Sequence, residues 1–263
     1  MSNKLIKYFL VHPATRNANI DAPATSKYRK RLIRDKAFLR RLYADWYEMI
    51  KRSLSYSFTG PIVELGSGGG FLNDVVPNLI TSDVFMLSHI DLVLNGQELP
   101  FRENTLQGII LIDVFHHIAR VKKFLVEAIR CLKPGGVVVM VEPWSSRWSR
   151  LIYRKFHHEP FDLKTEKWEF TCGGPLSMSN HALPWIVFER DRLILEAEFP
   201  QLQLVSVIPH TPFRYILSGG VSYRSFMPAY LFGMWSRFEK LLEPCMKSLA
   251  MFATITLVRT DSA

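Results

Sequence analysis

The chain has 263 residues, of which 48% are hydrophobic and 13% aromatic, so it can bury a substantial core and is not a disordered protein. Its formal net charge of +9 favours an anionic partner: a nucleotide, a nucleic acid, a lipid headgroup or an acidic substrate. Its cysteines, Cys131, Cys172 and Cys245, are far apart and form no C-x-x-C pair. This spacing argues against a disulfide framework or a cysteine zinc site and predicts a cytoplasmic protein.

The N-terminal part is predicted to be one long helix from Ser26 to about Ser57, within a helical cap region over residues 1–59. Apolar residues recur there at helical spacing and form one stripe: Leu39, Leu42, Tyr43, Trp46, Tyr47 and Ile50. The first half of the helix is strongly basic. We interpret the basic residues as a solvent-exposed face, with peripheral contact to an anionic inner membrane surface as the alternative.

Strands and helices alternate from residue 60 to 143. Strands are predicted at 62–65, 79–85, 89–94, 106–115 and 137–143, with helices from 71 to 78 and from 121 to 132. Such alternation predicts an α/β fold with a doubly wound, mostly parallel sheet, which binds ligands at the carboxyl ends of its strands. Two late strands, from Leu202 and Met251, are expected to close it as an antiparallel pair.

The rest of the chain, residues 144–263, is expected to complete the same single domain. It contains two insertions after strands 5 and 6, at about 144–184 and 211–249, and both are rich in aromatic residues. An aromatic-lined lid of this kind would enclose an apolar ligand and exclude water. We therefore expect the insertions to form the substrate side of the molecule.

The stretch VELGSGGGFL, residues 63–72, places Gly66, Gly68, Gly69 and Gly70 directly behind the first predicted strand. Missing side chains permit close approach of a ligand, and exposed N–H groups at a helix start suit a polar or anionic one. No G-K-[ST] follows, which excludes a P-loop, and Phe71 stands where the dinucleotide fingerprint needs glycine. The remaining pattern is an acid, Glu64, followed by G-x-G-x-G.

That pattern resembles the first motif of the class I S-adenosylmethionine-dependent methyltransferases, particularly the type 11 group. Further stretches resemble motifs of the family in the same order: Asp83, NGQELPF (95–101), IDVFHHI (112–118) and LKPGGVVVMVEP (132–143). Two positions depart from the family, because Asn95 and Gln107 stand where it usually has aspartate. The resemblance implies a Rossmann-like sheet of seven strands.

S-adenosylmethionine is the cofactor that the resemblance implies, and S-adenosylhomocysteine the product. Asp83 would hold the ribose hydroxyls, and the segment from Asn95 to Phe101 would pack along the adenine. The full set of implied cofactor-binding residues is Glu64, Gly66, Ser67, Gly68, Gly70, Asp83, Asn95, Leu99 and Asp113.

Histidines supply the candidate chemistry. His116 and His117 follow the fourth predicted strand, where a general base would sit if the acceptor must lose a proton. Alternatively, one packs in the core and the other lines the cofactor pocket. His157 and His158 are candidate acceptor contacts, together with Trp144 and Tyr153, or else they have structural roles. No metal is expected, because adjacent histidines on a strand point to opposite faces and no second ligand pair is evident.

The predicted function is methyl transfer from S-adenosylmethionine to a small-molecule, lipid-linked or glycan-linked acceptor. A nucleic-acid methyltransferase is disfavoured, because the basic residues cluster on one helix and no N-P-P-Y-type tetrapeptide follows the fourth strand. A noncatalytic cofactor-binding scaffold or regulator is disfavoured because the glycine loop and Asp83 are both present. A nicotinamide dehydrogenase is the least favoured reading.

Overall fold

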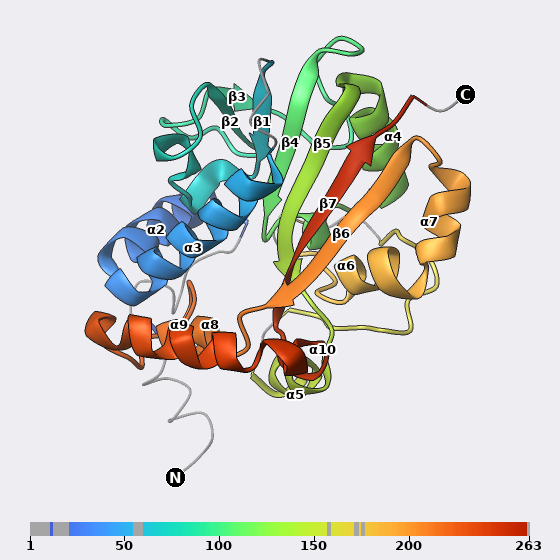
Figure 1. Ribbon diagram of the computed structural model, residues 1–263. Coiled ribbons are helices and arrows are strands. Elements are labelled where there is room, and N and C mark those ends of the chain that lie inside the picture. Colours follow the sequence, from blue (N-terminus) through green and yellow to red (C-terminus); the bar gives the residue numbers. More distant parts are fainter. Residues whose placement is uncertain are drawn as a thin grey trace.

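A computed structural model describes residues 11–12, 21–54, 60–156, 159–170, 174 and 177–261 (Figure 1). Its seven-stranded sheet has the order β3-β2-β1-β4-β5-β7-β6. The strands are β1 (Ile62–Leu65), β2 (Leu79–Asp83), β3 (Leu92–Val93), β4 (Leu106–Ile112), β5 (Leu132–Pro143), β6 (Leu202–His210) and β7 (Phe252–Arg259). The strands from β3 to β5 pair in parallel, whereas β7 is antiparallel to both β5 and β6. The predicted fold class and its closing antiparallel pair are confirmed.

Both faces of the sheet are covered, because alternate residues along a strand are buried in two different core clusters. Ile109 and Leu111 of β4 belong to one core cluster, and Ile110 and Ile112 belong to the other. Helix α4 (Val121–Cys131) packs on the first face with α7 (Arg192–Glu198), and α3 (Ala37–Ser53) packs on the second (Figure 1). Burial on both faces explains why β4 and β5 are almost continuously apolar.

The prediction of one N-terminal helix is wrong. The chain forms α2 (Pro23–Asp35) and α3, separated at Lys36, whose backbone leaves the helical region at φ −87° and ψ 89°. The Lys36 ammonium group donates hydrogen bonds to the carbonyls of Gly220 (2.5 Å) and Tyr223 (2.9 Å). These long-range bonds hold the break in place and override the helical periodicity.

The predicted helix at 71–78 is also wrong, because only a 3₁₀ turn forms over Leu72–Asp74. Pro77 cannot donate a helical hydrogen bond and disfavours helical backbone at the residue before it. Asn78 follows in the left-handed region at φ 56°. The third strand is likewise shorter than predicted, since it spans only Leu92–Val93.

The insertions after β5 and β6 are helical. The first contains α5 (Arg147–Phe156) and α6 (Leu183–Trp185), which leads through a π-helical turn, Ile186–Arg190, to α7. The second contains α8 (Arg214–Ser218), α9 (Phe232–Leu241) and α10 (Met246–Leu249). Among the residues that the structure describes, no helix combines the length and apolar character required to cross a membrane.

Candidate active site

A cavity of about 330 Å³ lies at the carboxyl ends of β1, β2 and β4. Most of the residues predicted to bind the cofactor line it: Glu64, Gly66, Gly68, Gly70, Asp83, Asn95 and Asp113. Ser26 and Arg29 of α2 and Tyr43 and Tyr47 of α3 add a further wall. The N-terminal helices therefore border the same cavity as the glycine loop.

Ser67 and Leu99 do not line the cavity but support it from behind. The Ser67 hydroxyl lies 3.4 Å from the carbonyl of Glu64, to which it donates, and accepts from the amide of Ser82 at 3.2 Å. Leu99 is buried in the core, and its amide donates to Glu127. Their predicted contact with a cofactor finds no support in this placement.

The loop glycines admit neighbouring side chains at very close range. A Cβ on Gly66, whose φ is +73°, would lie 2.4 Å from a methyl group of Val114. A Cβ on Gly68 would lie 2.5 Å from Asp83 Oδ2, which accepts a hydrogen bond from the Gly68 amide at 3.1 Å. Asp83 Oδ1 also accepts from the amide of Phe85. The absence of a side chain at Gly68 is therefore what allows Asp83 to reach the loop.

Acidic groups dominate the polar side of the cavity. Glu64 is 3% exposed, and burial raises its pKa to about 7. Glu64 Oε2 is buried without a hydrogen bond among the described residues. Burial also raises the pKa of Asp83 and of Asp113. Carboxyls gathered around one cavity favour a ligand that carries positive charge.

Two of these polar residues adopt special local geometry. Asp113 has a left-handed backbone at φ 60°, a sparsely populated conformation for a residue other than glycine that is typical of functional sites. Asn95 Oδ1 accepts from the amide of Gln97 at 3.0 Å and from its side chain at 3.1 Å. The Asn95 oxygen thus holds the turn beside the cavity, and its contact with adenine stays a prediction.

The paired histidines lie in a 3₁₀ turn, Phe115–His117, which Glu142 at the end of β5 holds in place. Glu142 Oε1 accepts from the amides of Val114 (2.7 Å) and Phe115 (2.8 Å), and Oε2 accepts from His116 Nδ1 (2.8 Å). His116 is fully buried and does not line the cavity, whereas His117 does. Of the two predicted bases, only His117 is placed to touch a ligand in the cavity.

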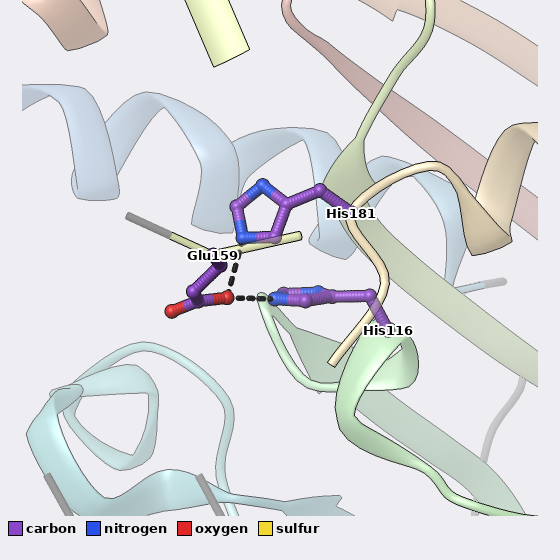
Figure 2. A group of neighbouring side chains, drawn as sticks. All are labelled: His116, Glu159 and His181. Carbon is purple, nitrogen blue, oxygen red and sulfur yellow. Dashed lines mark hydrogen bonds and ion pairs between the residues drawn. The ribbon is translucent and has the colours of Figure 1, made fainter. Parts of the chain in front are cut away.

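Glu159 connects these histidines to a third one (Figure 2). Its Oε2 accepts from His181 Nε2 at 2.6 Å and lies 3.5 Å from His116 Nε2 and 3.8 Å from His117 Nε2. Sequence reasoning missed Glu142, Glu159 and His181. Their only signals were the family-like fifth strand for Glu142 and the unusual HHEPF stretch for Glu159.

The buried histidines differ in their electrostatic environment. Burial opposes a charge on His116, but the adjacent carboxylates of Glu142 and Glu159 outweigh it and raise the His116 pKa to about 10. Burial and the nearby charge of His116 lower the pKa of His117 to about 3. The same two causes lower the pKa of His181. His117 therefore presents a neutral ring to the cavity.

Trp144 and Tyr153, predicted to contact the acceptor, do not line the cavity. Trp144 is 4% exposed within the core, and the buried Tyr153 hydroxyl donates to the carbonyl of Met251 at 2.5 Å. His157 and His158 lie outside the described residues. Other residues of the two insertions line the cavity instead: Phe170, Gly174, Met178 and Val221. Both side chains serve the core, so the predicted acceptor contacts of Trp144 and Tyr153 find no support in this placement and stay a prediction.

Comparison with known proteins finds a matching family model and several similar structures. Residues 74–140 match the family model described as a methyltransferase domain. The structure resembles the geranyl diphosphate C-methyltransferase of Streptomyces coelicolor A3(2), with 15% identity, 95% of this chain and 92% of that chain covered, and a TM-score of 0.52. A search of curated proteins finds no match.

Two further solved structures are similar. A geranyl diphosphate methyltransferase solved with S-adenosylmethionine has 16% identity over 95% of this chain and 96% of its own, with a TM-score of 0.52. A chain in the complex between the Haloferax volcanii Trm112 methyltransferase activator and a methyltransferase has 12% identity over 93% of this chain and 100% of its own, with a TM-score of 0.50.

The strand order and the glycine loop behind β1 give this chain the fold of the similar methyltransferase structures, and residues 74–140 match the methyltransferase-domain model. The resemblance predicted from the sequence is supported by the family model over residues 74–140, and the predicted fold is confirmed by the similar structures.

Proposed function

We propose that this protein transfers a methyl group from S-adenosylmethionine to a small-molecule acceptor with an apolar body. The observation that carries the proposal is the mixed polar and apolar lining of one cavity. Glu64, Asp83 and the glycine loop form its polar side, whereas Phe170, Met178 and Val221 supply apolar side chains from both insertions. A cofactor and an apolar acceptor can therefore meet in one enclosed space.

The residues present fit this cofactor. Glu64 offers a buried oxygen without a hydrogen bond among the described residues, and the glycine loop leaves room beside it. Asp83 would hold the ribose hydroxyls, Glu64 the amino group, and Arg29 of α2 the carboxylate. When bound, S-adenosylmethionine supplies a methyl group on a positively charged sulfur that needs no further activation.

The contribution of the protein is chiefly positioning. Holding two reacting groups in line can lower a barrier by roughly 7–11 kcal/mol. The apolar wall of Phe170, Met178 and Val221 would orient the acceptor and exclude water. His117 lines the cavity with a neutral ring, and we assign to it the role of accepting a hydrogen bond from an acceptor hydroxyl.

The exposed surface around α9 favours one particular acceptor, a lipid-like molecule at an anionic membrane surface. Tyr230, Met234 and Leu241, on α9 and just before it, are 80%, 54% and 79% exposed. Arg41 of α3 donates a hydrogen bond to the carbonyl of Ala229, in the 3₁₀ turn that precedes α9. Exposed apolar side chains beside basic ones are the pattern of an interfacial helix.

Product formation tests the proposed function. Purified protein is incubated with S-adenosylmethionine and, separately, with a metabolite extract, a lipid extract or nucleic acid, and S-adenosylhomocysteine is quantified by mass spectrometry. We expect product with the metabolite or lipid extract. Product with nucleic acid alone would overturn the assignment of the acceptor, and a protein that binds the cofactor but forms no product would favour the scaffold.

A further inference from the structure

His116, Glu159 and His181 form a second polar cluster (Figure 2), and none of the three lines the cavity. Each residue offers one ligand atom, and these atoms all lie within 4.8 Å of one another. His116 and His181 are buried, and Glu159 is partly buried. Methyl transfer as proposed above uses none of these side chains directly, so the cluster calls for a role of its own.

The hydrogen bond between His116 and Glu142 prepares one ring to bind a cation. His116 Nδ1 donates to Glu142 Oε2 at 2.8 Å, which directs Nε2 toward Glu159. Nε2 is buried and makes no hydrogen bond among the described residues, although it lies 3.5 Å from Glu159 Oε2. A carboxylate that accepts from the far nitrogen is the usual outer partner of a metal-bound histidine, because it fixes the tautomer and the ring orientation.

The ligand spacing is close to that of a small coordination sphere. Atoms bound at 2.0–2.1 Å to a tetrahedral ion lie about 3.3–3.5 Å apart. The separation of 3.5 Å between Glu159 Oε2 and His116 Nε2 already matches, whereas the 2.6 Å hydrogen bond to His181 Nε2 would have to lengthen by less than 1 Å. The rings converge on the same carboxylate oxygen, which the hydroxyl of Ser179 also contacts at 3.0 Å.

We propose that His116 Nε2, His181 Nε2 and Glu159 Oε2 bind a divalent transition-metal ion, with Zn²⁺ as the favoured ion. Two imidazoles and one carboxylate suit zinc and its neighbours, whereas Mg²⁺ and Ca²⁺ prefer oxygen ligands throughout. Three protein ligands leave a fourth position free. His117, which lines the cavity and has its Nε2 3.8 Å from Glu159 Oε2, stands beside that position.

The three ligands come from separate segments, so a bound ion would also link these segments to one another. His116 belongs to the turn after β4, whereas Glu159 and His181 belong to the insertion that follows β5. The ion would fasten this insertion, whose Phe170 and Met178 line the apolar wall, to the end of β4. Because the ligands are so distant in sequence, no local spacing motif predicts the site.

Metal analysis of untagged protein tests the proposal without requiring activity. Zinc content is measured by mass spectrometry after purification, and the chelated protein is then titrated with Co²⁺ and followed by its visible absorption. The variants are Glu159→Gln, His181→Gln and the outer-partner variant Glu142→Gln. The matched control is His210→Gln, which changes a partly buried histidine that is hydrogen-bonded to Thr211 and Thr254, away from the cluster.

We expect about one equivalent of zinc in the wild type and in the control. Affinity should fall at least tenfold in Glu159→Gln and His181→Gln, and by about 10–100-fold in Glu142→Gln. Wild-type protein that retains no zinc and gives no Co²⁺ absorption would overturn the proposal, whether or not the variants fold. Folded variants that bind as tightly as the wild type would do the same. A parallel titration with S-adenosylmethionine shows separately whether the proposed function fails.

Discussion

The two walls of the cavity are built in different ways. The polar wall uses short segments at neighbouring strand ends, where Gly68 and Asp83 are joined by a direct hydrogen bond. The apolar wall combines Phe170 and Met178 with Val221, from two separate insertions that contacts with distant segments hold in place, such as the hydrogen bond from the Phe170 amide to the Ala119 carbonyl. The first wall depends on local backbone geometry and the second on long-range contacts. Cofactor binding should therefore be sensitive to small backbone changes, whereas acceptor choice should follow the insertions.

Gly68→Val should break the polar wall most severely. The new Cβ would lie 2.5 Å from Asp83 Oδ2, so either the loop or Asp83 must move. Overpacking of this kind typically costs about 1–3 kcal/mol, in addition to the lost hydrogen bond. Calorimetry should show S-adenosylmethionine affinity reduced by about 100-fold or more. Gly233→Val is the matched control, because a Cβ there meets nothing within 4 Å, and unchanged affinity in both variants would contradict the account.

Asp83→Ala should have the next largest effect. Removing a charged hydrogen-bond partner typically costs about 1.5–3 kcal/mol, which corresponds to at least a tenfold loss of affinity. The exposed Asp35, paired with Arg31 on α2, provides a control through Asp35→Ala. Equal loss in the two variants would indicate a general effect of charge rather than a contact in the polar wall.

Acidic pH should weaken the polar wall through Glu64. Burial raises the Glu64 pKa to about 7, so this group is neutral below that pH and negative above it. A positively charged ligand binds the ionised form, and affinity for S-adenosylmethionine should therefore fall as the pH drops below about 7, by up to tenfold per unit. Binding near pH 7 should release a proton, which calorimetry in buffers of different ionisation enthalpy detects. Glu64→Gln should remove the pH dependence, and its persistence in that variant would exclude Glu64 as the cause.

The smallest effect is expected at the exposed surface of α9, in the second insertion. Leu241→Asp places a charge on an exposed apolar position of α9 and should weaken sedimentation with anionic lipid vesicles several-fold. Leu193→Asp changes an equally exposed leucine on α7 and should leave sedimentation unchanged. Equal binding to neutral and anionic vesicles, or equal loss in the two variants, would contradict the proposal that α9 binds an anionic membrane surface.

Sequence reasoning placed the polar wall because its determinants are local. Each strand end and loop is marked by glycines, carboxylates and apolar runs that occupy adjacent positions. The break at Lys36 was not foreseeable, since it depends on carbonyls of Gly220 and Tyr223. For the same reason the burial of Trp144 and Tyr153 could not be decided from the sequence, which does not indicate whether an aromatic side chain faces a core or a cavity. Glu159 and His181 meet His116 only after the insertion folds back onto β4.

The central claim is that the polar wall binds S-adenosylmethionine, and calorimetric titration of the wild-type protein at neutral pH tests it most directly. We expect micromolar binding of S-adenosylmethionine and S-adenosylhomocysteine, no binding of NADH, and loss of both sulfur ligands in Gly68→Val. A folded wild-type protein that binds neither sulfur ligand would contradict the assignment of this cavity as the cofactor site.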